Sequence, residues 1–449
     1  MKKYLIYLLI LMSGGIYFWI SQEVARTDFG LFFSLYSLLF LCYFLLLKAK
    51  ISHRLFFLTG LIYHLIVVFA LPWLSQDFYR FLWDGWMLQL GDNPYLFTPN
   101  QWLENTNEQN LIPKANFLIE EMGQLSASNY TNYPPISQFI YFLASFLAEK
   151  SIFYAVLFMK LVLVFSSIIT LFFSQKILSL LKLPTHKAYW FFLNPLVIIE
   201  GIGNLHFEVL MLAFFVASVY YLMKKNFLWA GVLLGLSVAT KLITLVFFIY
   251  LLNGVILGNK KFKFSNYFSA SSFQFIGGCL LTIAMSYVYF FDLQMLQNYQ
   301  ESVGLWFSSF EFNASFYYVF RWVGFQMYGY NMIAVLGKII FVLSAFSLLF
   351  FAFQQSSKKQ MFAWMFLGFA CYLFFSTTVH PWYVTTLILL GVFTKFYTAI
   401  LWSFLVMLSY YTYSQPNFQE STWLLFIQYV LVIGLFSYEL VDFWKKVPK

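Results

Sequence analysis

Three charged residues at steps of three and four open the only long polar segment of the chain. Asp77, Arg80 and Asp84 lie in the stretch SQDFYRFLWDGWMLQLGDNPY, which covers residues 75–95. On a helix this spacing places all three side chains on one face, with a carboxylate on each side of a guanidinium. Such a face offers a general base beside a cation. It is equally the pattern of a solvated amphipathic helix with a salt-bridge stripe.

The composition restricts where this segment can lie. The chain has 449 residues, of which 61% are hydrophobic and only 10% are charged, whereas soluble domains carry about 25% charged residues. These values predict an all-α polytopic membrane protein. The three cysteines are far apart in apolar runs, so neither a disulfide framework nor a thiolate metal site is expected.

Apolar runs of helical length recur along the whole chain and predict about 12–14 transmembrane helices. Two longer runs, 226–257 and 382–413, each predict a pair of short helices, because Lys241 interrupts the first and Lys395 the second. The remaining runs are near 4–20, 30–48, 55–74, 151–174, 188–203, 207–223, 268–290, 331–353, 361–378 and 422–441.

Basic residues distribute unequally when alternate loops are assigned to opposite sides. One side receives most of them, including Lys260, Lys261 and Lys263, and the positive-inside rule makes that side cytoplasmic. Both termini are then cytoplasmic, and the acidic residues fall mostly outside. The topology explains the net charge of +9, so no nucleic-acid partner is expected. The other side receives only Arg26, Arg80, Lys114, Lys150 and Arg321.

We expect a single integral membrane domain over residues 1–449, beginning with a helical hairpin over 1–54. Residues 75–150 form its largest outer segment. That segment ends in a run of about 14 apolar residues, 136–149, which is too short to span a bilayer and predicts an interfacial helix. In this topology the polar segment that contains Asp77 faces the outer side.

Other polar residues at or near membrane depth are candidates for function, because burying them in lipid is costly. The topology places them toward the same outer side as Asp77. Each also has a structural interpretation: a proline kink, a capped helix end, a lysine that snorkels to the interface, or an aromatic anchor. They are Asn194, Glu200, Asn204, His206, Glu208, Lys241, His380, Trp382 and Tyr383.

No metal or cofactor is predicted with certainty. The chain has no H-E-x-x-H or other tight ligand spacing. Asp77 together with His206 or Glu208 would suit a divalent ion through oxygen and nitrogen ligands, so a divalent metal ion remains possible.

Several blocks together resemble the GT-C glycosyltransferases, and in particular the bacterial mannosyltransferases that use polyprenyl-phosphate-mannose. The first block is DFYRFLWDGW followed by GDNPY. The others follow in the same order between about residues 75 and 383: YPP at 133–135, NPLVIIEGIGNLHFE at 194–208, AGVLLGLSVATK at 230–241, FNASFYYVFR at 312–321 and HPWY at 380–383.

The resemblance implies an inverting sugar transferase in the bacterial inner membrane that works on its outer, periplasmic side. Its donor would be a polyprenyl-phosphate-linked sugar, with mannose implied by the family alone. The acceptor is a glycan, a glycolipid or a protein. An acid early in the first outer loop serves as the base in such enzymes, and here that position is Asp77. Many relatives carry a second acid beside it, where this chain has Gln76, so the choice between Asp77 and Asp84 stays open.

The chemistry of the residues suits this reaction. Transfer with inversion needs one carboxylate to accept the proton of the acceptor hydroxyl, and a cation to hold the departing phosphate. Arg80, Lys241 and Arg321 are the predicted phosphate-binding cations, and the remaining outer polar residues are predicted to bind substrate. Since the cytoplasmic loops are short and carry no glycine-rich phosphate cradle, a lipid-borne donor is favoured over a nucleotide sugar.

Three other functions remain open. A lipid-linked sugar flippase or transporter would need charges deep in the bundle, for which Lys160 and Lys338 are candidates. A glycan polymerase or ligase would use an arginine-rich outer site, and few arginines are on that side. A purely structural membrane protein would make the acidic outer segment a solvated face.

Overall fold

The computed structural model describes residues 3–49, 51–257, 267–355 and 357–446. Within these ranges the chain is a bundle of helices joined by short loops, and the one β-type pairing is an isolated bridge between Phe312 and Thr378. The prediction of an all-α polytopic membrane protein is confirmed. The predicted cytoplasmic Lys260, Lys261 and Lys263 lie outside the described residues.

Within the described ranges, six helices are long and apolar enough to cross a membrane. A seventh span results if η2 (Val197–Gly203) and α11 (Glu208–Met223), which meet at a bend of 108°, are counted together. The six are α1 (Lys3–Gln22), α2 (Phe29–Lys48), α9 (Ile152–Leu180), α14 (Ala270–Tyr287), α17 (Ile333–Phe353) and α21 (Thr422–Lys446).

The expected 12–14 crossings are therefore not reproduced by helices of spanning length. The difference lies in apolar helices of 10–17 residues, which are shorter than the roughly 20 residues that a bilayer core requires. Examples are α3 (His53–Val68) and α18 (Met361–Phe374). An apolar run in the sequence shows that a segment is buried in protein or lipid, but its length does not show where the helix breaks.

Both long apolar runs are indeed divided into shorter helices. In the first, α12 (Phe227–Thr240) ends before Lys241, whose backbone is extended, and η3 (Leu242–Phe247) and α13 (Phe248–Leu257) follow. In the second, α19 (Val384–Val392) is separated from α20 (Thr398–Leu405), and the short turn η6 (Pro381–Tyr383) precedes α19. The charged residue marks the break in each run because a helix interior at membrane depth disfavours it.

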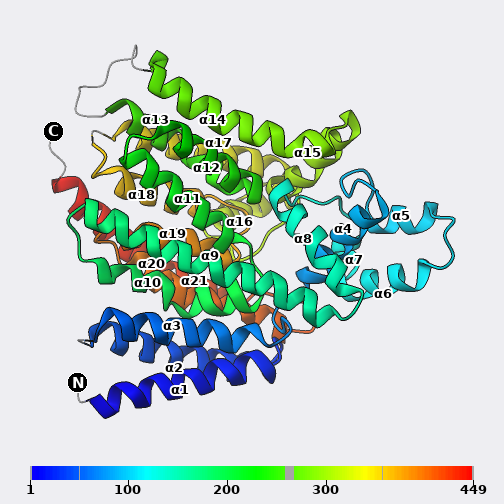
Figure 1. The fold of residues 1–449 in the computed structure, drawn as a ribbon, viewed down its shortest axis with the longest axis horizontal. Coiled ribbons are helices and arrows are strands. Elements are labelled where there is room, and N and C mark those ends of the chain that lie inside the picture. Colours follow the sequence, from blue (N-terminus) through cyan, green and yellow to red (C-terminus); the bar gives the residue numbers. More distant parts are fainter. Residues whose placement is uncertain (1–2, 50, 258–266, 356, 447–449) are drawn as a thin grey trace.

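The polar segment forms a separate group of helices at one end of the bundle (Figure 1). Its helices are α4 (Asp77–Leu90), α5 (Pro99–Asn105), α6 (Ile112–Met122), α7 (Gln124–Ala127) and α8 (Pro135–Ala148). The marked N and C ends lie at the opposite end of the bundle (Figure 1). This arrangement is the one that the charge distribution predicts, although which end faces the cytoplasm remains a prediction.

Helix α4 carries all three charged residues of the polar segment. It begins at Asp77 and ends at Gly91, whose φ of 84° is the left-handed conformation that glycine adopts most easily at a helix end. Helix α8 buries Tyr141 and Ala144 against the bundle and leaves Phe139 and Phe146 about half exposed. An apolar outer face on a helix of this length is typical of the interfacial helix predicted here.

Gly85 allows α4 and α8 to approach backbone to backbone. A Cβ atom at this position would lie 2.1 Å from the carbonyl oxygen of Tyr141. We expect Gly85→Ala to lower the free energy of unfolding by about 1–3 kcal/mol through overpacking. Gly277→Ala on α14 is the control, because a Cβ there meets nothing within 4 Å. Thermal unfolding in detergent measures both, and equal midpoints for the two variants would contradict this packing.

Candidate active site

Asp77 lies at the first position of α4, where the helix dipole favours an acidic side chain. It is half-buried. Among the residues that the structure describes, none donates a hydrogen bond to its carboxylate or forms an ion pair with it. An unpaired carboxylate at the wall of a cavity is available to accept a proton from a ligand.

That cavity has a volume of about 200 Å³ and is bounded by six parts of the chain. α4 and the loop before α8 form one wall, the end of α12 forms another, and α15 (Leu293–Ser308) covers it with Trp306. Six residues predicted from the sequence line the cavity together. They are Asp77, His206, Glu208, Lys241, Trp382 and Tyr383.

The break between η2 and α11 presents His206 and Glu208 to this cavity. η2 is a π-helix. Helices of this type are rare in proteins, and those that occur are often found at functional sites. Leu205 in the break has a φ of 61°, which is uncommon for a residue with a side chain. A strained turn of this kind is typical of sites where the surrounding packing holds a side chain in one direction.

Lys241 and Glu208 form an ion pair at the cavity wall. The lysine is exposed to 24% and the glutamate only to 2%, so the ammonium group remains reachable. An ammonium has three donors, and the pair with Glu208 uses one of them. The extended break before η3 therefore positions a cation that can still bind an anionic group of a ligand.

A stack of three rings begins at the cavity wall. His206 stacks on Trp382 with ring centroids 3.6 Å apart, and Trp382 stacks on His380 at 4.4 Å. Glu200 lies behind His206, with its Oε2 3.1 Å from Nε2 in contact rather than in an aligned hydrogen bond, and its other oxygen accepts a bond of 2.5 Å from Tyr410. Glu200 and His380 thus position the residues that reach the cavity.

His380 is neutral at physiological pH. Burial, followed by the neighbouring His206 and Lys241, lowers the pKa of His380 to about 3. Its role is therefore to support the Trp382 ring rather than to supply charge.

Arg80 and Asp84 lie outside the cavity lining, in contrast to the prediction that they act on substrate. Arg80 Nε donates to Asp84 at 2.8 Å, and both side chains are buried. Arg80 Nη1 also donates to the backbone carbonyls of Ser126 and Asn129. These carbonyls draw the guanidinium toward α7 and away from Asp77, so the helix face has one ion pair instead of a guanidinium between two carboxylates.

The partners of Asp84 complete a buried network. Thr131 and Gln138 donate to its second oxygen at 2.5 and 2.8 Å. Every oxygen of this carboxylate is therefore in use, which suits a structural role in holding the loop before α8. Between the two candidate bases, the geometry favours Asp77.

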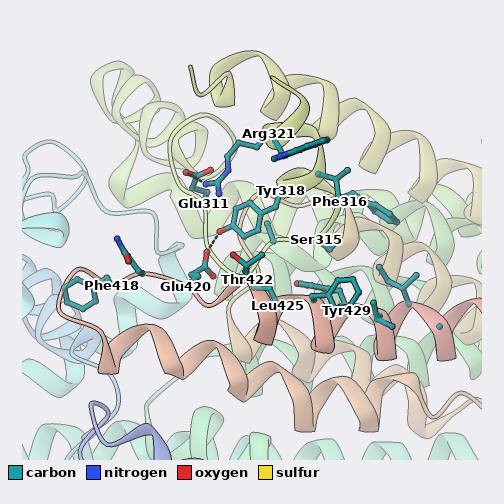
Figure 2. Close-up of a pocket in the computed structure, with 18 residues that line it drawn as sticks. Glu311, Ser315, Phe316, Tyr318, Arg321, Phe418, Glu420, Thr422, Leu425 and Tyr429 are labelled. Carbon is teal, nitrogen blue, oxygen red and sulfur yellow. Dashed lines mark hydrogen bonds and ion pairs between the residues drawn. The ribbon is translucent and has the colours of Figure 1, made fainter. Parts of the chain in front are cut away.

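Arg321 lies in a different cavity from Lys241. It is on α16 (Phe316–Tyr328), and its Nη1 pairs with Glu311 at 2.8 Å. Figure 2 shows it at the upper rim of a groove, above Tyr318. The prediction that Arg80, Lys241 and Arg321 act on one phosphate is therefore not reproduced by their positions.

Asn194 and Asn204 are buried away from the cavity lining. Asn194 Oδ1 accepts the N–H of Leu196 at 2.9 Å and its amide nitrogen donates to Ser403 at 3.2 Å, as in the turn of a proline kink. Asn204 Nδ2 has no hydrogen-bond partner within the described ranges. Neither residue is placed to touch a ligand in the cavity.

The two lysines predicted to lie deep in the bundle, Lys160 and Lys338, do not form a polar path through its described part. Lys160 is fully buried, and its Nζ donates to the carbonyls of Val67 at 2.9 Å and Ala70 at 2.6 Å. It thereby satisfies the orphan carbonyls at the end of α3. Lys338 is on the exposed surface of α17. Neither position favours a transport pathway.

The described residues contain no group of three or more His, Cys, Asp or Glu side chains placed to hold a metal ion. Of the three suggested ligands, His206 faces Glu200 and Glu208 pairs with Lys241, whereas Asp77 has no partner among the described residues.

Sequence reasoning missed three residues near the cavity. Tyr133 and Trp306 line it, and Tyr410 holds Glu200. Tyr133 belongs to the YPP block and Trp306 to an outer segment, so the sequence placed both on the outer side. It did not show that their side chains point into the cavity. Tyr410 is one tyrosine among many in an apolar run, and no local signal distinguishes it.

Residues 13–256 match the sequence model of the MptA_B family, described as alpha-(1->6)-mannopyranosyltransferase, N-terminal domain. The match covers more than half of the chain. It includes Asp77, the broken helix with Glu200, His206 and Glu208, and Lys241. A comparison with curated proteins finds no match.

Proposed function

Because the chain belongs to the alpha-(1->6)-mannopyranosyltransferase family, and so is a membrane-embedded glycosyltransferase acting on mannose, we propose that it transfers mannose from a polyprenyl-phosphate-linked donor to a glycan, glycolipid or protein acceptor. The reaction takes place on the outer face of the membrane, with inversion at the sugar and with Asp77 as the general base. Residues 1–449 act as one domain, of which 75–150 form the catalytic segment.

One observation carries this proposal. The carboxylate of Asp77 has no partner within the described residues, and it borders the same cavity as Lys241, the one lysine in the cavity lining. The other carboxylates near Asp77 are paired: Asp84 with Arg80, and Glu208 with Lys241. A base must be free to accept a proton, and Asp77 meets this requirement.

The cavity supports a single displacement. The acceptor oxygen forms a bond to the anomeric carbon while its proton moves to Asp77. The bond between that carbon and the phosphate oxygen breaks, and the polyprenyl phosphate leaves with the electron pair and one additional negative charge. Lys241 stabilises that charge through an ammonium donor that Glu208 does not use. General-base assistance of this kind contributes about 10²–10⁴ to the rate.

A lipid-borne donor also fits the position of the cavity. Residues of α4, of the end of α12 and of α15 line the cavity, together with two residues of the predicted interfacial helix α8. Figure 1 shows α4 and α8 at one end of the bundle. The test supplies purified protein with radiolabelled polyprenyl-phosphate-mannose or with GDP-mannose, together with a glycolipid extract. We expect label transfer from the lipid donor alone. Transfer from GDP-mannose in the absence of the lipid would contradict the proposal.

Lys241 should control donor binding. We expect Lys241→Gln to raise the KM for the lipid donor by about 10- to 100-fold, the range for losing one charge-assisted hydrogen bond. Lys241→Arg keeps the charge and should lose much less. Steady-state kinetics measure both, with thermal unfolding as a check that each variant folds. An unchanged donor KM in a folded Lys241→Gln protein would exclude a phosphate-binding role.

A further inference from the structure

A second and larger cavity lies between α16 and α21, with a volume of about 1060 Å³. Figure 2 shows it as a groove along α21, with the side chains of α16 above it. Ligand pockets for small molecules have volumes of about 300–1,000 Å³, so the volume of this groove lies at the upper end of that range. Its lining includes neither Asp77 nor Lys241, which separates it from the candidate active site.

The greater part of the groove is apolar and runs along a helix long enough to span a membrane. Its floor is one face of α21, a helix of spanning length, and consists of Leu425, Tyr429 and Ile433 at successive turns. Phe426 and Trp322 on its edges are 58% and 64% exposed. An apolar channel of this kind beside a transmembrane helix suits a hydrocarbon chain.

One end of the groove is polar and is built from charged groups. Arg321 Nη1 pairs with Glu311 at 2.8 Å, and Glu420 accepts the backbone N–H of Asn313 at 2.5 Å and the hydroxyl of Tyr318. Figure 2 shows Glu311, Tyr318 and Glu420 gathered at this end. With two carboxylates and one guanidinium, the end is net negative when both acids are ionised. Burial raises the pKa of Glu420, and the hydrogen bonds from Tyr318 and Asn313 and the nearby Arg321 offset this only in part.

Aromatic rings surround these charges. Tyr318, Trp322 and Phe418 all line the groove near its polar end, and Phe418 is 64% exposed. Arg321 already lies over the Tyr318 ring at 4.4 Å. Aromatic faces beside carboxylates are the usual environment for an ammonium group, which is attracted by both. The remaining N–H groups of Arg321, which pair with nothing in the described part of the chain, suit a phosphate.

We propose that this groove binds a phospholipid whose headgroup carries both a phosphate and an ammonium group. The hydrocarbon chain lies along α21, the phosphate contacts Arg321, and the ammonium contacts Glu420 and the aromatic rings. A lipid that is only anionic would meet one guanidinium already paired with Glu311, together with a second carboxylate. The charge of the site therefore selects the zwitterionic headgroup over phosphatidylglycerol and over a polyprenyl phosphate.

Native mass spectrometry tests this site on the full-length protein. The protein is released from vesicles that contain equal amounts of phosphatidylethanolamine and phosphatidylglycerol with identical acyl chains. We expect phosphatidylethanolamine to be retained about tenfold more than phosphatidylglycerol, a ratio that one cation–π contact and one ion pair can supply. Equal retention, or preferential retention of phosphatidylglycerol, would overturn the proposal.

Matched variants locate the lipid. Glu420→Gln keeps an oxygen that accepts the Asn313 N–H but removes the charge, so the preference should fall to near unity. Glu301→Gln is the control, because Glu301 is an exposed acid on α15 away from the groove. A preference that survives in Glu420→Gln would overturn the assignment.

A competition experiment on the wild-type protein needs no variant. Added polyprenyl-phosphate-mannose should leave the bound phosphatidylethanolamine in place, because the two lipids occupy different cavities. Displacement of phosphatidylethanolamine would instead show that the donor lipid enters the groove. The competition measures lipid binding alone, so its result does not depend on whether the protein transfers sugar.

Discussion

Replacement of Asp77 by asparagine is expected to lower kcat by about 10²–10⁴-fold, the usual contribution of a general base. The change removes the proton acceptor but keeps the size and shape of the side chain. Since the Asp77 carboxylate forms no hydrogen bond or ion pair with another described residue, its replacement disturbs no contact that holds the fold. We therefore expect the donor KM and the thermal unfolding of the variant to stay close to those of the wild type.

Glu104→Gln is the matched control for this prediction. Glu104 is an exposed acid on α5 in the same group of outer helices, and its loss should leave kcat unchanged. Initial rates with labelled lipid donor compare the three proteins. An Asp77→Asn variant that keeps more than half of the wild-type kcat would show that another group takes the proton.

The largest effect on stability is expected at Asp84. Asp84→Ala leaves the buried guanidinium of Arg80 without its carboxylate and removes the acceptor for Thr131 and Gln138. Breaking a buried ion pair by removal of one partner costs about 3–5 kcal/mol. We expect a large fall in the midpoint of thermal unfolding and a low yield of folded protein, with any loss of activity following from the loss of fold.

The chain provides a control with the same spacing. Asp442 and Lys446 also form an ion pair four residues apart, but their side chains are 51% and 67% exposed. Exposed pairs contribute little to stability, so Asp442→Ala should barely change the unfolding midpoint. If Asp84→Ala and Asp442→Ala shifted it equally, the buried network around Asp84 would not have the structural role assigned to it.

Local rules explain the ends of two helices, of which the end at Lys241 was predicted from the sequence. Gly91 ends α4 because glycine adopts the left-handed conformation easily, and Lys241 ends α12 because a charged residue disfavours an apolar helix interior. Both boundaries depend on a single residue and its chain neighbours. The number of spanning helices is harder to predict, because it depends on helix length and because breaks inside apolar runs also depend on packing between distant segments.

The sequence predicted only some features of the cavity: which residues lie on its side of the membrane, but not how their charges pair. His206, Glu208 and Lys241 were assigned to one side of the membrane from the charges in the loops, and the structure does bring them to the cavity that Asp77 lines. The partner of each charge was not predictable. The spacing on α4 allowed Arg80 to pair with either aspartate, and the carbonyls of Ser126 and Asn129, some 46 and 49 residues later, decide in favour of Asp84.

The most direct test of the account is the anomeric configuration of the product. Purified protein is supplied with polyprenyl-phosphate-mannose of known configuration and with an acceptor extract, and the new glycosidic linkage is assigned by NMR. A single displacement assisted by Asp77 predicts the opposite configuration in the product. Retention of the donor configuration would contradict it, because retention requires a second displacement and a covalent sugar intermediate on a nucleophile of the protein.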